Sequence, residues 1–176
     1  GEAWVDEASP AGTGLLAGIC VEWEEATRPA SDAGVRCVLP RLGVVLSPAG
    51  GALGRMLPMF RLGLGGPLGT GRQYLSWVAL ADLVGILRHC LATPQLHGPV
   101  NAVSPSPVPQ REFARALGAR LHRPARIPTP APLLRLVLGR MADELLLAGA
   151  RVRPTRLLES GYPFLAPDLE AGLAGI

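Results

Sequence analysis

The longest extended apolar stretch of the chain is residues 35–46, Val35-Arg36-Cys37-Val38-Leu39-Pro40-Arg41-Leu42-Gly43-Val44-Val45-Leu46. A continuous apolar run that is rich in valine is typical of a parallel strand buried on both faces. Pro40 interrupts the run, and because proline lacks an N–H group it cannot donate to a central ladder. We therefore predict a buried parallel strand with a bulge or a strand end near Pro40.

The segments on both sides of this strand alternate between helical and extended patterns. Towards the N-terminus, residues 14–27 predict a helix that Pro29 stops, and its apolar face consists of Leu15, Leu16, Ile19, Cys20 and Trp23. Towards the C-terminus, apolar spacing predicts helices at 52–62, 83–92, 110–122, 131–148 (broken near Gly139), 154–160 and 167–173, and strands at 74–80 and 98–103. This alternation indicates an α/β fold.

The composition excludes several kinds of chemistry. The chain has 176 residues, of which 48% are hydrophobic, so it can bury a core despite 22 glycines and 18 prolines. All 17 basic residues are arginines. A Schiff-base lysine, a P-loop lysine and a lysine general base are therefore excluded within this chain, because arginine does not deprotonate in proteins.

The sequence also gives no indication of a metal-binding, membrane-spanning or secreted protein. The three cysteines form no C-x-x-C pair, and the three histidines have no ligand spacing, so we predict no metal site. No apolar run reaches the length of a membrane span. The acidic N-terminal residues do not resemble a signal or transit peptide. We expect an intracellular protein, cytoplasmic or mitochondrial, whose first residue, a glycine, suggests a processed chain or a fragment.

The glycine-rich stretch 63–71 permits two interpretations. It could cradle a phosphate, but it does not run from a strand into a helix as phosphate-binding fingerprints do. A loop in which two backbones approach closely is the favoured interpretation. Arg72 and Gln73 end this loop and precede a strand that carries Trp77. Arginine is the usual clamp for phosphates and carboxylates, so these three residues are predicted to contact substrate.

Four other polar residues receive structural interpretations. Asp82 could be a catalytic acid, but its place after a strand favours a helix N-cap. His89 lies on the polar side of the same helix and is predicted to be a surface residue. Arg111 and Arg115 lie opposite the apolar face of their helix, which favours a solvated face. With a net charge of only +3 and few aromatic residues, we predict no nucleic-acid binding.

Two segments resemble a known family. Arg41-Leu42-Gly43-Val44-Val45-Leu46-Ser47-Pro48 resembles the segment that follows the sixth strand of extended short-chain dehydrogenase/reductases. The stretch 50–73, GGALGRMLPMFRLGLGGPLGTGRQ, is similar to their epimerase-family branch, which includes bacterial cell-division-inhibitor-like proteins. The resemblance covers nearly the whole chain.

The resemblance implies the C-terminal part of a doubly wound, parallel, Rossmann-type sheet with a small α+β substrate lobe. Residues 1–46 would end the nucleotide-binding domain, residues 47–125 would hold mixed sheet and lobe elements, and residues 126–176 would form a helical, family-specific domain. The implied cofactor is NADP, whose glycine-rich fingerprint would lie upstream. The implied partners are a small-molecule substrate and either a missing N-terminal half or a second copy, but no nucleic acid and no membrane.

The resemblance also assigns residues. Leu42, Gly43, Val44 and Val45 match the strand end whose backbone faces the nicotinamide, although they are also ordinary strand core. Arg72 and Gln73 match the substrate-side loop, and Asp82 matches the acidic residue of the W-I-H-x-x-D segment.

Four positions depart from the pattern of the family. Aligned through Trp23-Glu24-Glu25, the active-site tyrosine and lysine positions are Gly14 and Gly18. The histidine of the W-I-H segment is Ala79, and Pro40 replaces an apolar residue. The lysine of these enzymes holds the nicotinamide ribose and lowers the pKa of the tyrosine, so its loss impairs proton transfer.

Two hypotheses follow. The first is an NADP-dependent oxidoreductase or epimerase-like protein whose substrate is unknown. The second is a catalytically degenerate, truncated relative that binds a ligand or a partner protein.

Overall fold

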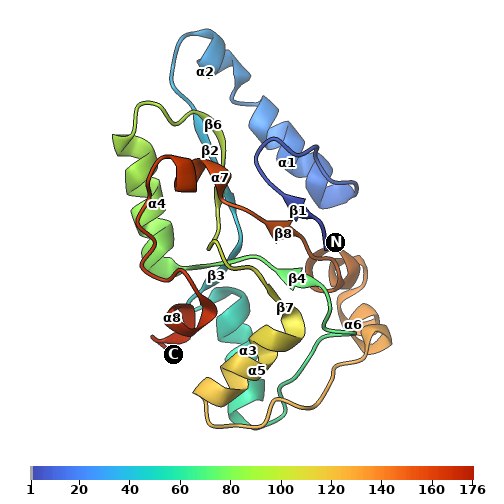
Figure 1. Cartoon of the computed structure of the whole chain (residues 1–176). Coiled ribbons are helices and arrows are strands. Elements are labelled where there is room, and N and C mark those ends of the chain that lie inside the picture. The colour runs from blue at the N-terminus through green and yellow to red at the C-terminus, as the bar shows by residue number, and fades with distance from the viewer. Residues whose placement is uncertain (1) are drawn as a thin grey trace.

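The computed structural model describes residues 2–176 and has a mixed α/β architecture (Figure 1). The strands are β1 (Trp4–Val5), β2 (Val38–Leu42), β3 (Val44–Leu46), β4 (Tyr74–Leu75), β5 (Trp77–Ala79), β6 (Gly98–Ala102), β7 (Val108–Pro109) and β8 (Arg151–Val152). The α-helices are α1 (Leu15–Glu25), α2 (Arg28–Asp32), α3 (Gly51–Arg61), α4 (Leu80–Ala92), α5 (Gln110–Arg120), α6 (Ala131–Leu138), α7 (Thr155–Glu159) and α8 (Leu169–Leu173). A π-helix, η1, spans Ala142–Leu147.

Parallel pairs form the centre of the molecule. β2 pairs with β6, so that Val38 lies opposite Gly98 and Leu42 opposite Ala102. β3 also pairs in parallel, with β5. Helices α4 and α1 lie on opposite sides of β2 and β6 in Figure 1. The α/β fold predicted from the alternation of helices and strands, and its Rossmann type implied by the family resemblance, are therefore confirmed.

The predicted break at Pro40 is wrong, because Pro40 lies inside β2 opposite Val100. The Gly43 N–H donates to Ala102 O, and Cys37 O accepts from the Gly98 N–H. In a parallel strand, the backbone N–H and C=O groups of every second residue point to the same neighbouring strand. The backbone groups of the odd-numbered residues 37–43 therefore point to β6. The backbone of Pro40 points to the opposite edge of β2, so its missing N–H group removes no hydrogen bond to β6.

The break lies at Gly43 instead, where the chain changes partner from β6 to β5. A Cβ at Gly43 would lie 2.7 Å from Ser76 O and 2.8 Å from a methyl group of Val103. Only glycine allows the two backbones to approach this closely. The strand predicted at 74–80 is also divided, because β4 pairs antiparallel with β7 whereas β5 pairs with β3.

Two apolar clusters form the core. The larger one joins α3, α5 and α8 around Trp77 and Phe113, both of which are almost fully buried. The smaller one packs α4 against β2, β3 and β6, with Ile86, Val100 and Leu157 at its centre. Arg111 and Arg115 lie on the exposed side of α5, as predicted.

Helix α1 differs from its prediction. Within Leu15–Glu25 no residue is buried, and Trp23, expected on the apolar face, is 71% exposed. Pro29 does not stop this helix, which ends at Glu25, but lies in the first turn of α2. Proline is tolerated there because the N–H groups of a first turn have no intrahelical partner.

The C-terminal region contains the predicted helix pair and one unexpected strand. The pair is broken at Gly139, whose φ of 57° lies in the left-handed region that favours glycine. β8 follows and pairs in parallel with β1, both in segments without a predicted strand. The first and last predicted domains therefore share a small sheet, and the boundaries at 46 and 125 stay a prediction.

Candidate functional site

A cavity of about 610 Å³ opens between α1 and the junction of β2 with β3. Its walls also include parts of residues 5–12, 74–76 and 145–152. Pockets for small organic molecules typically measure about 300–1,000 Å³. The cavity is therefore large enough for a small ligand or for one end of a larger one.

Helix α1 forms one wall of the cavity. Ala17, Cys20, Val21 and Glu24 line it, with the i, i+3, i+4, i+7 spacing that places residues on one helix face. The Leu16 N–H at the start of α1 donates to Glu144 Oε2 of η1 at 3.2 Å. This bond satisfies one of the N–H groups that a helix leaves unpaired at its start, and it ties η1 to α1.

The positions aligned with the family's tyrosine and lysine are open. Gly14 precedes α1 with a φ of 121°, a conformation that favours glycine. Gly18 lies within the helix. A Cβ built at either position would meet no atom within 4 Å. No neighbouring side chain therefore fills the space that a larger residue would take.

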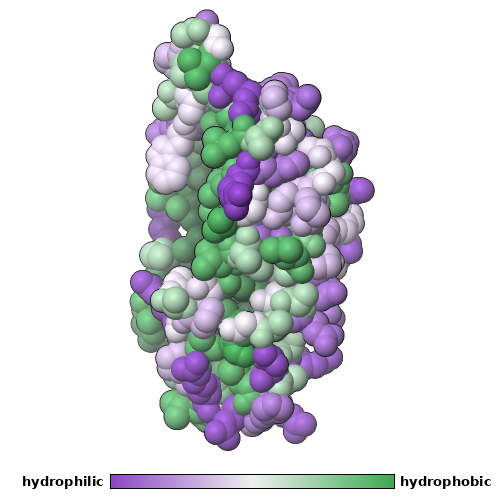
Figure 2. Space-filling view, turned by 90° about the vertical axis from the view of Figure 1, so that its left-hand side faces the viewer, coloured by the Kyte–Doolittle hydropathy of each residue, from purple (hydrophilic) through white to green (hydrophobic). Residues whose placement is uncertain are grey.

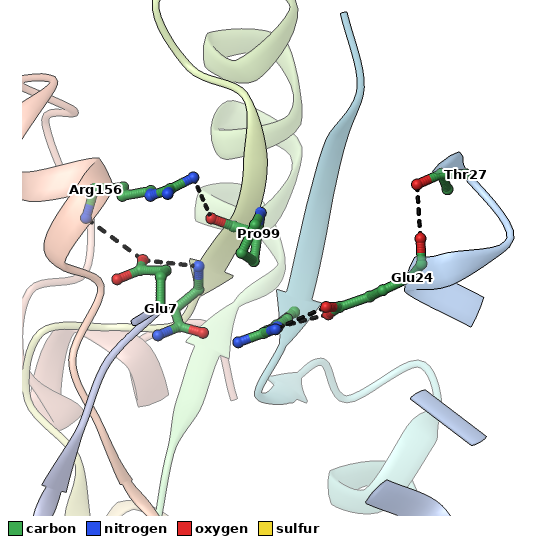
Figure 3. A network of polar contacts seen from close by, with 7 residues as sticks. Glu7, Glu24, Thr27, Pro99 and Arg156 are labelled. Carbon is green, nitrogen blue, oxygen red and sulfur yellow. Dashed lines mark hydrogen bonds and ion pairs between the residues drawn. The ribbon is translucent and has the colours of Figure 1, made fainter. Parts of the chain in front are cut away.

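An ion pair joins α1 to β2 at the cavity wall. Arg41 Nε donates to Glu24 Oε1 at 2.6 Å, and Arg41 Nη2 donates to Glu24 Oε2 at 2.7 Å (Figure 3). This bidentate hydrogen bonding holds the pKa of the Glu24 carboxyl below its usual range. Neither residue of this pair was predicted from the sequence to have a role. An arginine inside an apolar strand was the available signal, because a charge in such a place needs a partner.

A buried carboxylate secures the segment beside this wall. Glu7 is 7% exposed, and its Oε1 accepts from the backbone N–H groups of Asn101 at 3.0 Å and Arg156 at 3.4 Å (Figure 3). The Arg156 guanidinium donates to Pro99 O at 3.0 Å and to His97 O. Residues 5–7 are thus tied to both β6 and α7.

Three of the four residues predicted to face the nicotinamide line the cavity, namely Leu42, Gly43 and Val44. Leu42 is 57% exposed, which is unusual for a leucine at a strand end. Val45 points the other way and packs against the smaller core cluster. The cofactor role of these residues stays a prediction.

The residues predicted to contact substrate lie outside the cavity lining. Arg72 is exposed on the glycine-rich loop. The Gln73 side-chain amide donates to Leu68 O at 3.0 Å and Leu146 O at 2.9 Å, so it links the loop to η1. Trp77 is fully buried, and its indole N–H donates to Ser106 O. Their substrate role stays a prediction.

Asp82 does not cap its helix, which begins earlier, at Leu80. Its carboxylate is 1% exposed and accepts from the N–H groups of Leu165 and Ala166, both at 2.8 Å. The Tyr162 hydroxyl donates to the same carboxylate at 3.1 Å. Asp82 therefore anchors the chain between α7 and α8, a role that requires partners about 80 residues away.

His89 is half-buried rather than a free surface residue. Its Nε2 lies 2.9 Å from Ser160 Oγ, and its ring meets the Tyr162 ring edge-on at 5.4 Å. Among residues 2–176, no three His, Cys, Asp or Glu side chains are grouped so as to hold a metal ion.

The glycine-rich stretch 63–71 has the close backbone approach that was favoured. A Cβ at Gly66 would lie 2.2 Å from Ile127 O, and one at Gly65 would meet the Phe60 ring. None of the loop's glycines belongs to the cavity lining. In the part of the chain that the structure describes, no helix is long and apolar enough to cross a membrane.

Comparisons of sequence relate the chain to proteins of larger size. Residues 129–176 match a family model described as a domain of unknown function, DUF1731. An epimerase family protein of Mycobacterium bovis is 51% identical over 160 residues, which are 91% of this chain and 53% of that protein. The human epimerase family protein SDR39U1 is 45% identical over 172 residues, 97% of this chain and 58% of that protein. The chain thus spans a little over half the length of these relatives.

Solved structures show the same relationship. The crystal structure of human SDR39U1 (isoform 2) with NADPH superposes with a TM-score of 0.93 at 44% identity, covering 99% of this chain and 59% of that one. A nucleoside-diphosphate sugar epimerase of Corynebacterium glutamicum gives a TM-score of 0.77 at 35% identity, covering 99% and 33%.

Proposed function

Since the chain belongs to the epimerase family of short-chain dehydrogenase/reductase type, we propose that it is the C-terminal part of an NADP(H)-dependent oxidoreductase. The observation that carries this proposal is the cavity beside Leu42, Gly43 and Val44. It lies at the strand end where the family resemblance puts the nicotinamide, and a relative at 44% identity was crystallised with NADPH.

The residues present fit one end of this cofactor. The mainly apolar cavity wall suits a nicotinamide ring, and Leu42, Gly43 and Val44 would hold it. The bound cofactor would supply or accept a hydride. The chain's own contribution is to shape the wall, through the Glu24–Arg41 pair that fixes α1 against β2, and to keep water from one side of the ring.

The phosphate end of the cofactor has no comparable site in this cavity. Arg41 is its one basic lining residue among residues 2–176, and Glu24 already pairs with it. Anions are usually held by free arginine or lysine, or by a helix N-terminus behind a glycine-rich turn. We propose that a further, N-terminal segment of the protein holds the pyrophosphate and decides between NADP and NAD.

Calorimetric measurement of NADPH binding tests whether the pyrophosphate site lies outside this chain. We expect the 176-residue chain to bind NADPH weakly or not at all, because the cavity formed by residues 2–176 has no free basic group for the pyrophosphate. A chimera that joins the N-terminal half of the Mycobacterium bovis relative to this chain should bind it with micromolar affinity or better. Tight binding by the chain alone would contradict the proposal, as would a well-folded chimera that does not bind.

A second candidate function is ligand or partner binding without catalysis. The open positions at Gly14 and Gly18 favour it, because the family's proton-transfer pair is missing. In the chimera, Gly18→Lys should raise residual turnover if the redox function holds, and Gly50→Lys is the control, because a Cβ at Gly50 also meets open space but Gly50 does not line the cavity. Unchanged turnover in the presence of bound NADPH favours the binding protein. We place either form in the cytoplasm or the mitochondrion, with a small molecule as ligand.

A further inference from the structure

The cavity wall is built mainly of carbon. Its apolar side chains come from the N-terminal loop, α1, the strand ends, η1 and the segment that follows η1. They are Val5, Pro10, Ala11, Ala17, Val21, Leu42, Val44, Leu75, Val103, Leu145, Ala148, Ala150 and Val152. A ligand seated here exchanges water for hydrocarbon over most of its surface, which favours an apolar compound.

The charged groups of the wall offer no free cation. Among the residues that the structure describes, the lining contains two carboxylates, Asp6 and Glu24, and one guanidinium, Arg41. Both ends of the Glu24 carboxylate are bound by Arg41, at 2.6 and 2.7 Å. The lining therefore carries a net formal charge of −1, and its single positive charge is neutralised at close range.

Three of the five neutral polar side chains of the lining are engaged within the chain, and the other two are the Tyr74 hydroxyl and the Cys20 thiol. Ser76 Oγ donates to Ala150 O at 2.8 Å and accepts from the Val152 N–H at 3.0 Å. Asn101 Nδ2 donates to Arg153 O at 3.0 Å. Ser9 Oγ donates to Asp6 Oδ1 at 2.9 Å and accepts from the Asp6 N–H. These bonds leave a ligand few polar side chains to recruit from the wall.

Two neighbouring arginines, Arg151 and Arg72, add no positive charge to the cavity lining. The Arg151 guanidinium is stacked between two rings, 4.1 Å from the centre of Trp4 and 4.9 Å from that of Tyr74, and it is outside the lining. Arg72 is exposed on the glycine-rich loop, also outside the lining. An anion inside the cavity would therefore meet a negative wall without a free arginine.

We propose that this cavity takes an uncharged, largely apolar carbonyl compound, or the corresponding alcohol, and rejects nucleoside-diphosphate sugars. A nucleoside diphosphate carries charges that proteins normally neutralise with free arginine, lysine or helix N-termini. The redox step rests on the proposed function. In it, the reduced nicotinamide would supply a hydride to the carbonyl carbon and a hydronium ion from solvent would protonate the carbonyl oxygen, giving the alcohol, the oxidised cofactor and water.

Fluorescence titration of the 176-residue chain with an aryl ketone tests the apolar half of the proposal. The probe is 6-propionyl-2-dimethylaminonaphthalene, whose emission shifts to the blue in apolar sites. We expect saturable binding that millimolar UDP-glucose does not displace. Leu145→Glu, which places a charge in the lining, should weaken binding about tenfold or more. Leu136→Glu is the matched control, because Leu136 is an exposed leucine of α6 that does not line the cavity.

Two adjacent glutamates test the charge half. Glu24→Gln frees Arg41 inside the cavity, and UDP-glucose affinity measured by calorimetry should rise about tenfold. Glu25→Gln removes the same charge but affects only an exposed contact with Arg28 at 3.9 Å, so it should change nothing. Circular dichroism confirms that each variant is folded.

The outcomes separate the substrate class from the redox function. The substrate class is overturned if the unsubstituted chain binds UDP-glucose in competition with the probe, or if Leu145→Glu and Leu136→Glu bind the ketone equally well. Failure of the chimera to reduce any ketone, with ketone binding intact, refutes the redox function alone.

Discussion

Single charged residues in this chain join segments that are far apart in sequence. Asp82 holds the backbone before α8, Glu7 holds β6 and α7, and Glu24 holds β2. Arg36 donates to the carbonyls of Cys90, Leu91 and Leu96, and so satisfies the C-terminal end of α4. Each of these groups is charged, and hydrogen bonds to charged groups are stronger than neutral ones.

The phenol of Tyr162 makes stability depend on pH in the alkaline range. Burial, with Asp82 as the second cause, raises the pKa of Tyr162 to about 12, against about 10 in an unfolded chain. Between these values the unfolded state binds fewer protons, so the free energy of unfolding falls as pH rises. The contribution is fully present below pH ~10, and we expect about 2 kcal/mol to be lost by pH ~12.

Urea unfolding at several pH values measures this loss. Tyr162→Phe should lack it, so the stability difference between the parent chain and this variant shrinks as pH rises. Tyr74→Phe removes the chain's other phenol and should retain the loss. Parallel curves for the parent chain and Tyr162→Phe would show that Tyr162 does not titrate in this way.

At the scale of elements, the glycines of the loop 63–71 allow its backbone to pack closely against another segment. The loop runs beside residues 127–129: the Gly69 N–H donates to Thr129 O, and the Ile127 N–H donates to Gly65 O. Gly65 and Gly66 have no side chain to keep these backbones apart. The loop thus joins α3 to the C-terminal region and is used for contact within the chain.

Gly66→Ala tests this close approach. The new methyl group would lie 2.2 Å from Ile127 O and within 3 Å of other backbone atoms of Ile127, which cannot move aside as a side chain can. We expect a loss of roughly 2–3 kcal/mol in the free energy of unfolding, measured with urea. Gly12→Ala is the control, because its Cβ meets only Ala17 Cβ at 3.8 Å, and it should change stability by less than about 0.5 kcal/mol. Equal stabilities would mean that the loop is not closely packed.

At the scale of the whole molecule, the exposed surface is large for the mass. The chain exposes 10416 Å², whereas a compact monomer of 18.4 kDa is expected to expose about 8,200 Å². The excess is larger than the roughly 600–1,000 Å² that one partner contributes to a standard protein interface. Figure 2 looks onto the side where α4 lies and shows apolar residues in a band along it. Exposed residues of α4 include Leu80, Val84, Leu87 and Leu91.

We expect the isolated chain to self-associate through this face. Light scattering after size exclusion should give a mass above 18.4 kDa that rises with concentration. The double change Val84→Glu and Leu91→Glu should lower it. Leu136→Glu with Val137→Glu, on exposed α6, is the contrasting pair. A monodisperse monomer with a cooperative melt would contradict the prediction.

The order of most helices and strands, the parallel character of the central strand and the family follow from the sequence alone, whereas α2 and the short strands β1, β7 and β8 do not. The features that follow depend on local spacing, on the valine-rich run 35–46 and on the motif at 50–73, all of which are contiguous. The strand break nevertheless lies at Gly43 and not at Pro40, because the neighbouring strand decides which peptide groups need an N–H donor.

The tertiary structure decided the site. The cavity, the Glu24–Arg41 pair and the anchoring role of Asp82 all depend on residues that meet only after folding. The spacing of apolar residues in α1 predicts a half-buried helix, yet no residue within Leu15–Glu25 is buried. An apolar helix face is buried only where a neighbouring folded segment covers it. Spacing along one chain carries no information about which distant segment provides that neighbour.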